Sequence, residues 1–147
     1  MHRSLALVIS VLVLTMTVAP ASQAVETVWS GLVMAENVVQ PQPVPSELTR
    51  IEGLLKKFFG YNQFQVIGQS QKTLKTGQED WLATSKFFGL HVDARGEIPV
   101  GYVLNLKLYK EKELLLETET KLSKRSPLVI KGPQVGGGQL LLVLMVQ

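Results

Sequence analysis

The sequence predicts an α+β, mostly β protein, in which one N-terminal amphipathic helix packs on an antiparallel sheet of about six to seven strands. Apolar residues recur at helical spacing over residues 47–59, apolar and polar residues alternate over 100–109 and 114–121, and residues 140–146 are all apolar. A strand without polar positions is typical of a strand covered on both faces. These patterns favour a small sandwich or a curled sheet.

The helix is expected at residues 47–59. Ser46 is a suitable N-cap, because its hydroxyl can accept a hydrogen bond from the first turn. Leu48, Ile51 and Leu55 then recur on one face, and Gly60 favours a stop. The aromatic residues on either side of this stop are expected in the core where helix meets sheet: Phe58, Phe59, Tyr61, Phe64, Trp81, Phe87 and Phe88.

Strands and turns fill the rest of the chain. Expected, in order, are a strand at 63–70, one or two strands within 80–93, a turn at 94–97, a strand at 100–109, a charged hairpin tip at 110–113, strands at 114–121 and 128–131, a glycine-bearing turn at 132–138 and a closing strand at 139–146. The glycine-bearing turn lacks the Lys and the Ser or Thr that end a phosphate-binding loop, so we interpret it as a hairpin loop.

The first residues have the layout of a secretory signal peptide. A short basic start, His2 and Arg3, precedes an apolar run over residues 5–18, which is shorter than the roughly 20 residues needed to cross a bilayer. Small residues follow, and cleavage is expected after Ala24, or alternatively after Ala21. We therefore expect a periplasmic or secreted protein; an uncleaved membrane anchor is the alternative.

Three parts of the chain are expected. Residues 1–24 are the signal peptide, residues 25–45 are an N-terminal arm and a linker, and residues 46–147 are a single helix-plus-β domain. A short strand within residues 25–39 is the alternative to the arm. The linker is inferred from the alternating Gln and Pro of residues 40–45, because each proline favours an extended backbone.

Composition excludes several classes of function. The chain has no cysteine, so disulfides, thiolate metal sites, a cysteine nucleophile and a lipid-modified cysteine are all excluded. A net charge of +3 is too small to predict nucleic-acid binding. No cofactor and no metal site is predicted. Membrane contact is expected only peripherally or through an uncleaved signal.

Few side chains could carry catalysis. His91 has Asp93 two positions further on the same face of a strand, and Ser85 earlier in the chain, which is the minimum for a small hydrolase. Glu79 and Asp80 precede Trp81, an arrangement of carboxylates and an aromatic platform that suits carbohydrate. Because neighbouring strand residues point to opposite faces, we do not expect a catalytic pair here and predict no enzyme.

Candidate partner-binding residues are Trp81, Tyr61, Lys124 and Arg125. Lys124 and Arg125 belong to a local basic cluster with Lys121 and Lys131, which we interpret as the rim of a solvated loop. The chain-terminal apolar strand is a further candidate, because it could pair with the sheet edge of a partner.

Residues 128–132 and 136–140 form a closing pattern of an apolar strand, a glycine-rich turn and another apolar strand. This pattern resembles the way in which β-domains of pilus and secretion-channel proteins end. The resemblance implies an accessory role in a cell-envelope assembly, with another envelope protein as partner. The first alternative is a carrier of a small apolar ligand or lipid, with a helix lid over a cavity lined by Leu104, Leu106, Leu116 and Leu142. The second is a small hydrolase using His91, or a carbohydrate binder using Trp81 and Tyr61.

Overall fold

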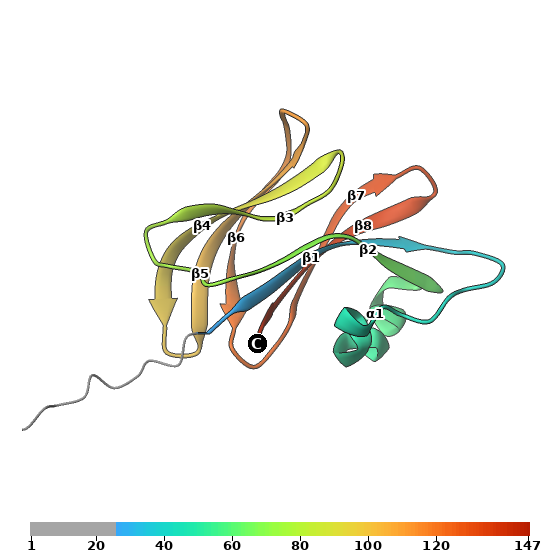
Figure 1. Cartoon of the computed structure of the whole chain (residues 1–147), viewed down its shortest axis with the longest axis horizontal. Helices are drawn as coiled ribbons and strands as arrows, with labels where there is room; N and C mark the ends of the chain where they lie inside the picture. Colours follow the sequence, from blue (N-terminus) through green and yellow to red (C-terminus); the bar gives the residue numbers. More distant parts are fainter. Residues whose placement is uncertain (1–25) are drawn as a thin grey trace, which may run out of the picture.

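The computed structural model describes residues 26–147 and shows a mostly β fold in which two four-stranded antiparallel sheets pack face to face (Figure 1). Sheet A has the order β2-β1-β8-β7 and sheet B the order β3-β4-β5-β6. The strands are β1 (Val28–Glu36), β2 (Gln63–Lys72), β3 (Glu79–Thr84), β4 (Phe88–Ile98), β5 (Gly101–Lys110), β6 (Glu113–Ser123), β7 (Leu128–Val135) and β8 (Gly138–Val146). The signal peptide expected at residues 1–24, with its cleavage site at Ala24 or Ala21, lies outside the described residues.

The strand count exceeds the prediction because the stretch expected to be an arm is β1, a central strand of sheet A. β1 pairs with β2 on one side and with β8 on the other. Its side chains are buried on both faces: Val28 and Leu32 face sheet B, while Trp29 and Val33 face the helix. Burial on both faces removes the apolar–polar alternation by which a strand is found in a sequence, so the arm prediction is wrong.

β8 confirms the prediction of a strand covered on both faces. Leu140, Leu142 and Leu144 pack between the two sheets, and Leu141 and Val143 pack toward the helix. β8 lies between β1 and β7, so it has no exposed edge. The proposal that this chain-terminal strand pairs with a partner therefore loses its basis.

The helical segment is a 3-10 helix, η1 (Ser46–Ile51), followed by α1 (Glu52–Phe59). It covers the face of sheet A that points away from sheet B, and it follows β1 rather than opening the domain (Figure 1). Gly60 ends α1 with a left-handed φ of 63°, as predicted. The prediction of a Ser46 N-cap is wrong: its side chain makes no cap bond, and the N–H of Leu48 donates to the carbonyl of Pro45 at 2.9 Å.

Two cores result, one between the sheets and one between sheet A and the helix. The helix-side core contains the only tryptophan of β1, Trp29, together with Leu55 and Phe64. Phe88 lies between the sheets instead. Phe58, Trp81 and Phe87 are exposed, which corrects the expectation that they belong to a helix-to-sheet core.

Sheet B is a chain of consecutive hairpins. The turn predicted at residues 94–97 is a register shift between Ala94 and Gly96, and β4 continues to Ile98. The charged hairpin tip between β5 and β6 is confirmed, with Glu111 at a left-handed φ of 55°. Because side chains alternate along each strand, one face of sheet B fills the core and the other faces solvent.

Candidate functional site

An aromatic group lies on the outer face of sheet B, where strand pairing brings three strands together. Trp81 in β3 pairs with His91 in β4, and Gly89 in β4 pairs with Tyr109 in β5. The centroid of the Trp81 ring lies 5.0 Å from that of His91, edge to face, and 5.6 Å from that of Tyr109. Trp81 is nevertheless 46% exposed. The arrangement presents a large aromatic surface to solvent on a rigid sheet.

Gly89 leaves room for one edge of the Trp81 indole beside β4. A Cβ atom on Gly89 would lie 3.0 Å from Cζ3 of Trp81, closer than most such contacts. A strand glycine often marks a place where another group approaches the backbone closely. Here the group is the Trp81 ring. Because Gly89 has no Cβ atom, this ring can lie close to the backbone of β4.

Phe87 extends this surface at the tip of the β3–β4 hairpin. The Ser85 N–H donates to the Phe88 carbonyl at 2.8 Å, and the Phe88 N–H donates to Ser85 Oγ at 3.0 Å. The Glu111 N–H, in the neighbouring hairpin, donates to the Phe87 carbonyl at 2.8 Å. Phe87 is 49% exposed although its backbone is held from both sides. An exposed ring on an ordered backbone loses little conformational entropy on binding.

Trp81, Phe87 and Tyr109, together called the aromatic patch, border a shallow pocket of about 290 Å³. Ser85, Lys86 and Glu111 contribute polar atoms to its rim. The Lys86 ammonium lies 5.4 Å from the centre of the Phe87 ring, a cation–π distance. Apolar rings inside a polar rim are suited to binding a side chain or a single sugar ring.

The three side chains of the hydrolase alternative, His91, Asp93 and Ser85, each contact other groups. The His91 ring packs against Trp81, and His91 pairs across the sheet with Lys107. The Asp93 carboxylate forms an ion pair with Arg95 at 3.3 Å, and Ser85 Oγ accepts the Phe88 N–H. Each of the three candidate groups therefore has a different neighbour.

Glu79 and Asp80 do not form a carboxylate pair. Glu79 pairs with Asp93 in the β3–β4 ladder, whereas the Asp80 carboxylate binds Lys72 of β2 at 3.0 Å and accepts the Trp81 N–H at 2.8 Å. Asp80 thus helps to join the two sheets. The hydrogen bond that Asp80 accepts also holds the backbone N–H of Trp81.

The other predicted partner-binding residues lie elsewhere. Tyr61 is half-buried against the helix-side core of sheet A. Lys124 forms ion pairs with Glu26 at 3.3 Å and with Glu97 at 3.7 Å, and its neighbour Arg125 is exposed in the turn before β7. The structure therefore brings none of these three to Trp81. The sequence missed Phe87 and Tyr109 as parts of the patch, because cross-strand register decides which aromatics meet.

Tyr102, Glu26 and Lys124 form a polar cluster of their own. The Tyr102 hydroxyl donates to Glu26 at 2.8 Å, and Lys124 Nζ lies 5.8 Å from the centre of the Tyr102 ring. Burial, then the hydrogen bond to Glu26, raises the pKa of Tyr102 to about 12. The hydrogen bond from Tyr102 lowers the pKa of Glu26; burial acts in the opposite direction, and Lys124 adds to the lowering.

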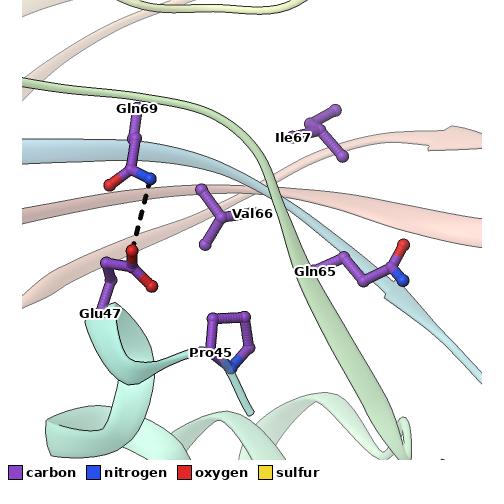
Figure 2. Close-up of a pocket in the computed structure, with 6 residues that line it drawn as sticks. All are labelled: Pro45, Glu47, Gln65, Val66, Ile67 and Gln69. Carbon is purple, nitrogen blue, oxygen red and sulfur yellow. Dashed lines mark hydrogen bonds between the residues drawn. The ribbon is translucent and has the colours of Figure 1, made fainter. Parts of the chain in front are cut away.

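A second pocket, of about 380 Å³, lies between η1 and β2 (Figure 2). Gln69 Oε1 accepts from Trp29 Nε1 at 3.0 Å, and Gln69 Nε2 donates to Glu47 at 3.5 Å. Figure 2 shows this Gln69–Glu47 bond crossing from β2 to the helical segment. The Gln69 amide is thus already engaged within the protein, and we interpret it as a link that holds η1 on sheet A.

The interior between the sheets is filled by side chains. Leu104, Leu106 and Leu142 are each at most 1% exposed and belong to one packed core, against which half-buried Leu116 also packs. The helix lies on the opposite face of sheet A and does not close over these residues. The prediction of a lidded cavity, made for the apolar-ligand carrier, is therefore wrong.

The turn at Gly136 and Gly137 joins β7 to β8, which confirms the hairpin interpretation of the glycine-rich loop. The turn is shorter than the predicted range 132–138, because β7 continues to Val135. Within residues 26–147, no three His, Asp or Glu side chains are grouped so that they could hold a metal ion. None of the helices in this range has the length and apolar character needed to cross a membrane.

Comparison with protein-family models, with curated proteins and with solved structures finds no match to this chain.

Proposed function

We propose that this protein is an exported, non-enzymatic cell-envelope protein that acts as a small protein-interaction module, accessory to a larger assembly of secretion or pilus type. The observation that carries the proposal is the aromatic patch: Trp81 and Phe87 are about half exposed, at 46% and 49%, on a backbone that neighbouring hairpins hold in place. Large exposed aromatics with a polar rim are typical of the energetic centres of protein interfaces.

Site-specific photo-crosslinking in the source organism tests this function. A photoreactive amino acid at position 81 or 87 should capture one envelope protein, whereas the same group at Val39, which is 99% exposed and outside the patch, should not. In purified form, Trp81→Ala should lose the captured complex and keep the wild-type unfolding transition. Equal capture at Val39, or no capture from the patch, would contradict the proposal.

Export is a separate part of the proposal, supported by the signal-like layout of residues 1–24. Intact mass of the protein recovered from the envelope fraction should equal that of residues 25–147, or of 22–147 for the alternative cleavage. A full-length mass would instead show that the N-terminal segment is retained as an anchor.

A second candidate function is carbohydrate binding by the same patch. It is favoured by the exposed Trp81 ring next to the Ser85 and Glu111 rim, since an exposed indole can stack on a sugar ring. Retention of the protein on insoluble cell-wall polysaccharide, lost in Trp81→Ala, would favour this candidate over a protein partner.

A further inference from the structure

β7 offers an exposed sheet edge beside α1, on the opposite sheet from the aromatic patch. In the part of the chain that the structure describes, β7 pairs with β8 alone, so alternate N–H and C=O groups of Leu128–Lys131 face away from the sheet. The ladder shifts register between Lys131 and Gln134, and Gln139 Nε2 donates to the Gly132 carbonyl at 2.6 Å. This bulge ends the regular edge after four residues, a length of about 13 Å.

An apolar groove runs beside this edge. It has a volume of about 390 Å³ and is lined only by Leu54, Phe58, Phe59, Pro127, Leu128 and Val129. Val129 points toward the helix-side core, so side chains on that face of an added strand would lie next to the last turn of α1. Phe58 is 68% exposed there, which is unusual for a ring of this size on a helix that packs its other face.

Two lysines without an ion pair among the described residues neighbour the residues that line the groove. Lys57 precedes Phe58, and its ammonium lies 5.7 Å from the centre of the Phe58 ring. Lys131 is exposed on β7, two positions after Val129. The other lysine in the last turn of α1, Lys56, binds Glu52 at 2.8 Å. The charges of Lys57 and Lys131 therefore suit an acidic partner.

We infer that the groove between α1 and β7 is a second docking surface, which binds an extended, acidic segment of a partner polypeptide as an added strand on β7. Its backbone pairs with Leu128–Lys131, one apolar side chain enters the groove against Phe58, and its acidic side chains meet Lys57 and Lys131. Strand addition combines main-chain hydrogen bonds with pockets for alternate side chains. A second copy of this chain fits less well, because it would bring two sets of the same lysines to one interface.

The test uses the isotope-labelled protein without its signal segment and a synthetic peptide in which leucine alternates with glutamate. Amide resonances of Leu128–Lys131 and of the last turn of α1 should shift. A peptide with lysine in place of glutamate, and one with methylated backbone nitrogens, should each bind about tenfold more weakly or not at all. Phe58→Ala and Lys57→Glu should weaken binding of the glutamate peptide by about threefold to tenfold.

Val100→Ala is the matched control, since it truncates a similarly exposed apolar side chain, 65% against 68% for Phe58, in the β4–β5 turn of the other sheet and should leave peptide binding unchanged. Absence of shifts with the glutamate peptide, equal binding of the lysine peptide, or shifts at the aromatic patch would each overturn the inference. Shifts of the same residues with protein concentration alone would show a second copy as the occupant. Shifts with anionic phospholipid vesicles but not with peptide would show that the groove binds a lipid surface. Either of these last two results would also overturn the inference of an acidic peptide partner.

Because the two surfaces lie on different sheets, their tests fail independently. Loss of capture at positions 81 and 87 would contradict the proposed function and leave the β7 groove as the docking surface. Loss of peptide binding at the groove would leave the aromatic patch untouched.

Discussion

Tyr102 shows how a single residue ties the beginning of the described chain to sheet B. Its ring is buried in the core between the sheets while its hydroxyl donates to Glu26, two residues before β1. Buried hydroxyls need such a partner, because an unsatisfied polar group costs about 1–3 kcal/mol. The cluster therefore holds the N-terminal end of β1 on sheet B.

The raised pKa of Tyr102 predicts a specific loss of stability at high pH. Its ordinary pKa is 10.0 and its pKa in the fold is about 12, so the contribution of the neutral hydroxyl is complete below pH 10 and is lost as pH rises through about 12. The unfolding free energy of the wild type, measured with urea, should fall across this window more steeply than that of Tyr102→Phe. Parallel curves would contradict the assignment.

Glu26→Gln serves as the companion variant for this experiment. It keeps a hydrogen-bond acceptor but removes the charge that disfavours tyrosinate, so its high-pH loss should be intermediate. At the acid end, the lowered pKa of Glu26 makes a contribution that is present above its ordinary value of 4.5 and is lost as pH falls through the lower pKa in the fold.

At the scale of elements, α1 is held by packing rather than by its own stability. It has eight residues, and isolated helices shorter than about 12–15 residues are marginal in water. Leu55 is fully buried against sheet A, whereas Phe58, three positions later, is exposed. The two residues therefore differ sharply in what they contribute to the helix-to-sheet contact.

Leu55→Ala should destabilise the protein by about 2–5 kcal/mol, because it leaves a cavity between α1 and sheet A. Phe58→Ala removes a larger side chain but should change the unfolding free energy by no more than about 0.5 kcal/mol. Urea unfolding of both variants measures this difference. Equal losses of unfolding free energy in the two variants would mean that Phe58 is packed in the core. The groove beside β7 would then lose its exposed aromatic side chain.

At the scale of the whole molecule, β1 joins the parts of sheet A. It lies between β2 and β8, and its two faces contribute to both cores. β2 and β8 are far apart in the chain, so without β1 the sheet would be divided into a lone strand, β2, and the β7–β8 hairpin. A lone strand cannot satisfy its backbone groups except with water.

A chain that begins at residue 40 should therefore fail to fold, whereas a chain that begins at residue 25 should fold like the mature protein. Circular dichroism during urea unfolding and amide dispersion in NMR spectra are the measurements. A cooperative transition in the shorter chain would show that residues 28–36 are a dispensable arm after all.

Much of the local structure could be predicted from the sequence. Strands β5 and β6 follow from alternation of period two, and the end of α1 follows from Gly60, because these signals depend on residues close in the chain. The covered strand β8 was also predictable, since a strand without polar residues is typical of burial on both faces.

Which strands meet could not be predicted from local patterns and follows from the folded arrangement. The role of β1, the partners on either side of β8 and the exposed edge of β7 depend on contacts between distant segments, which no local pattern encodes. The same holds for the aromatic patch: register places Trp81, His91 and Tyr109 together and leaves Phe88 inside while Phe87 is exposed. A shift of one residue in register would reverse the faces, so the aromatic patch is a property of the assembled sheets.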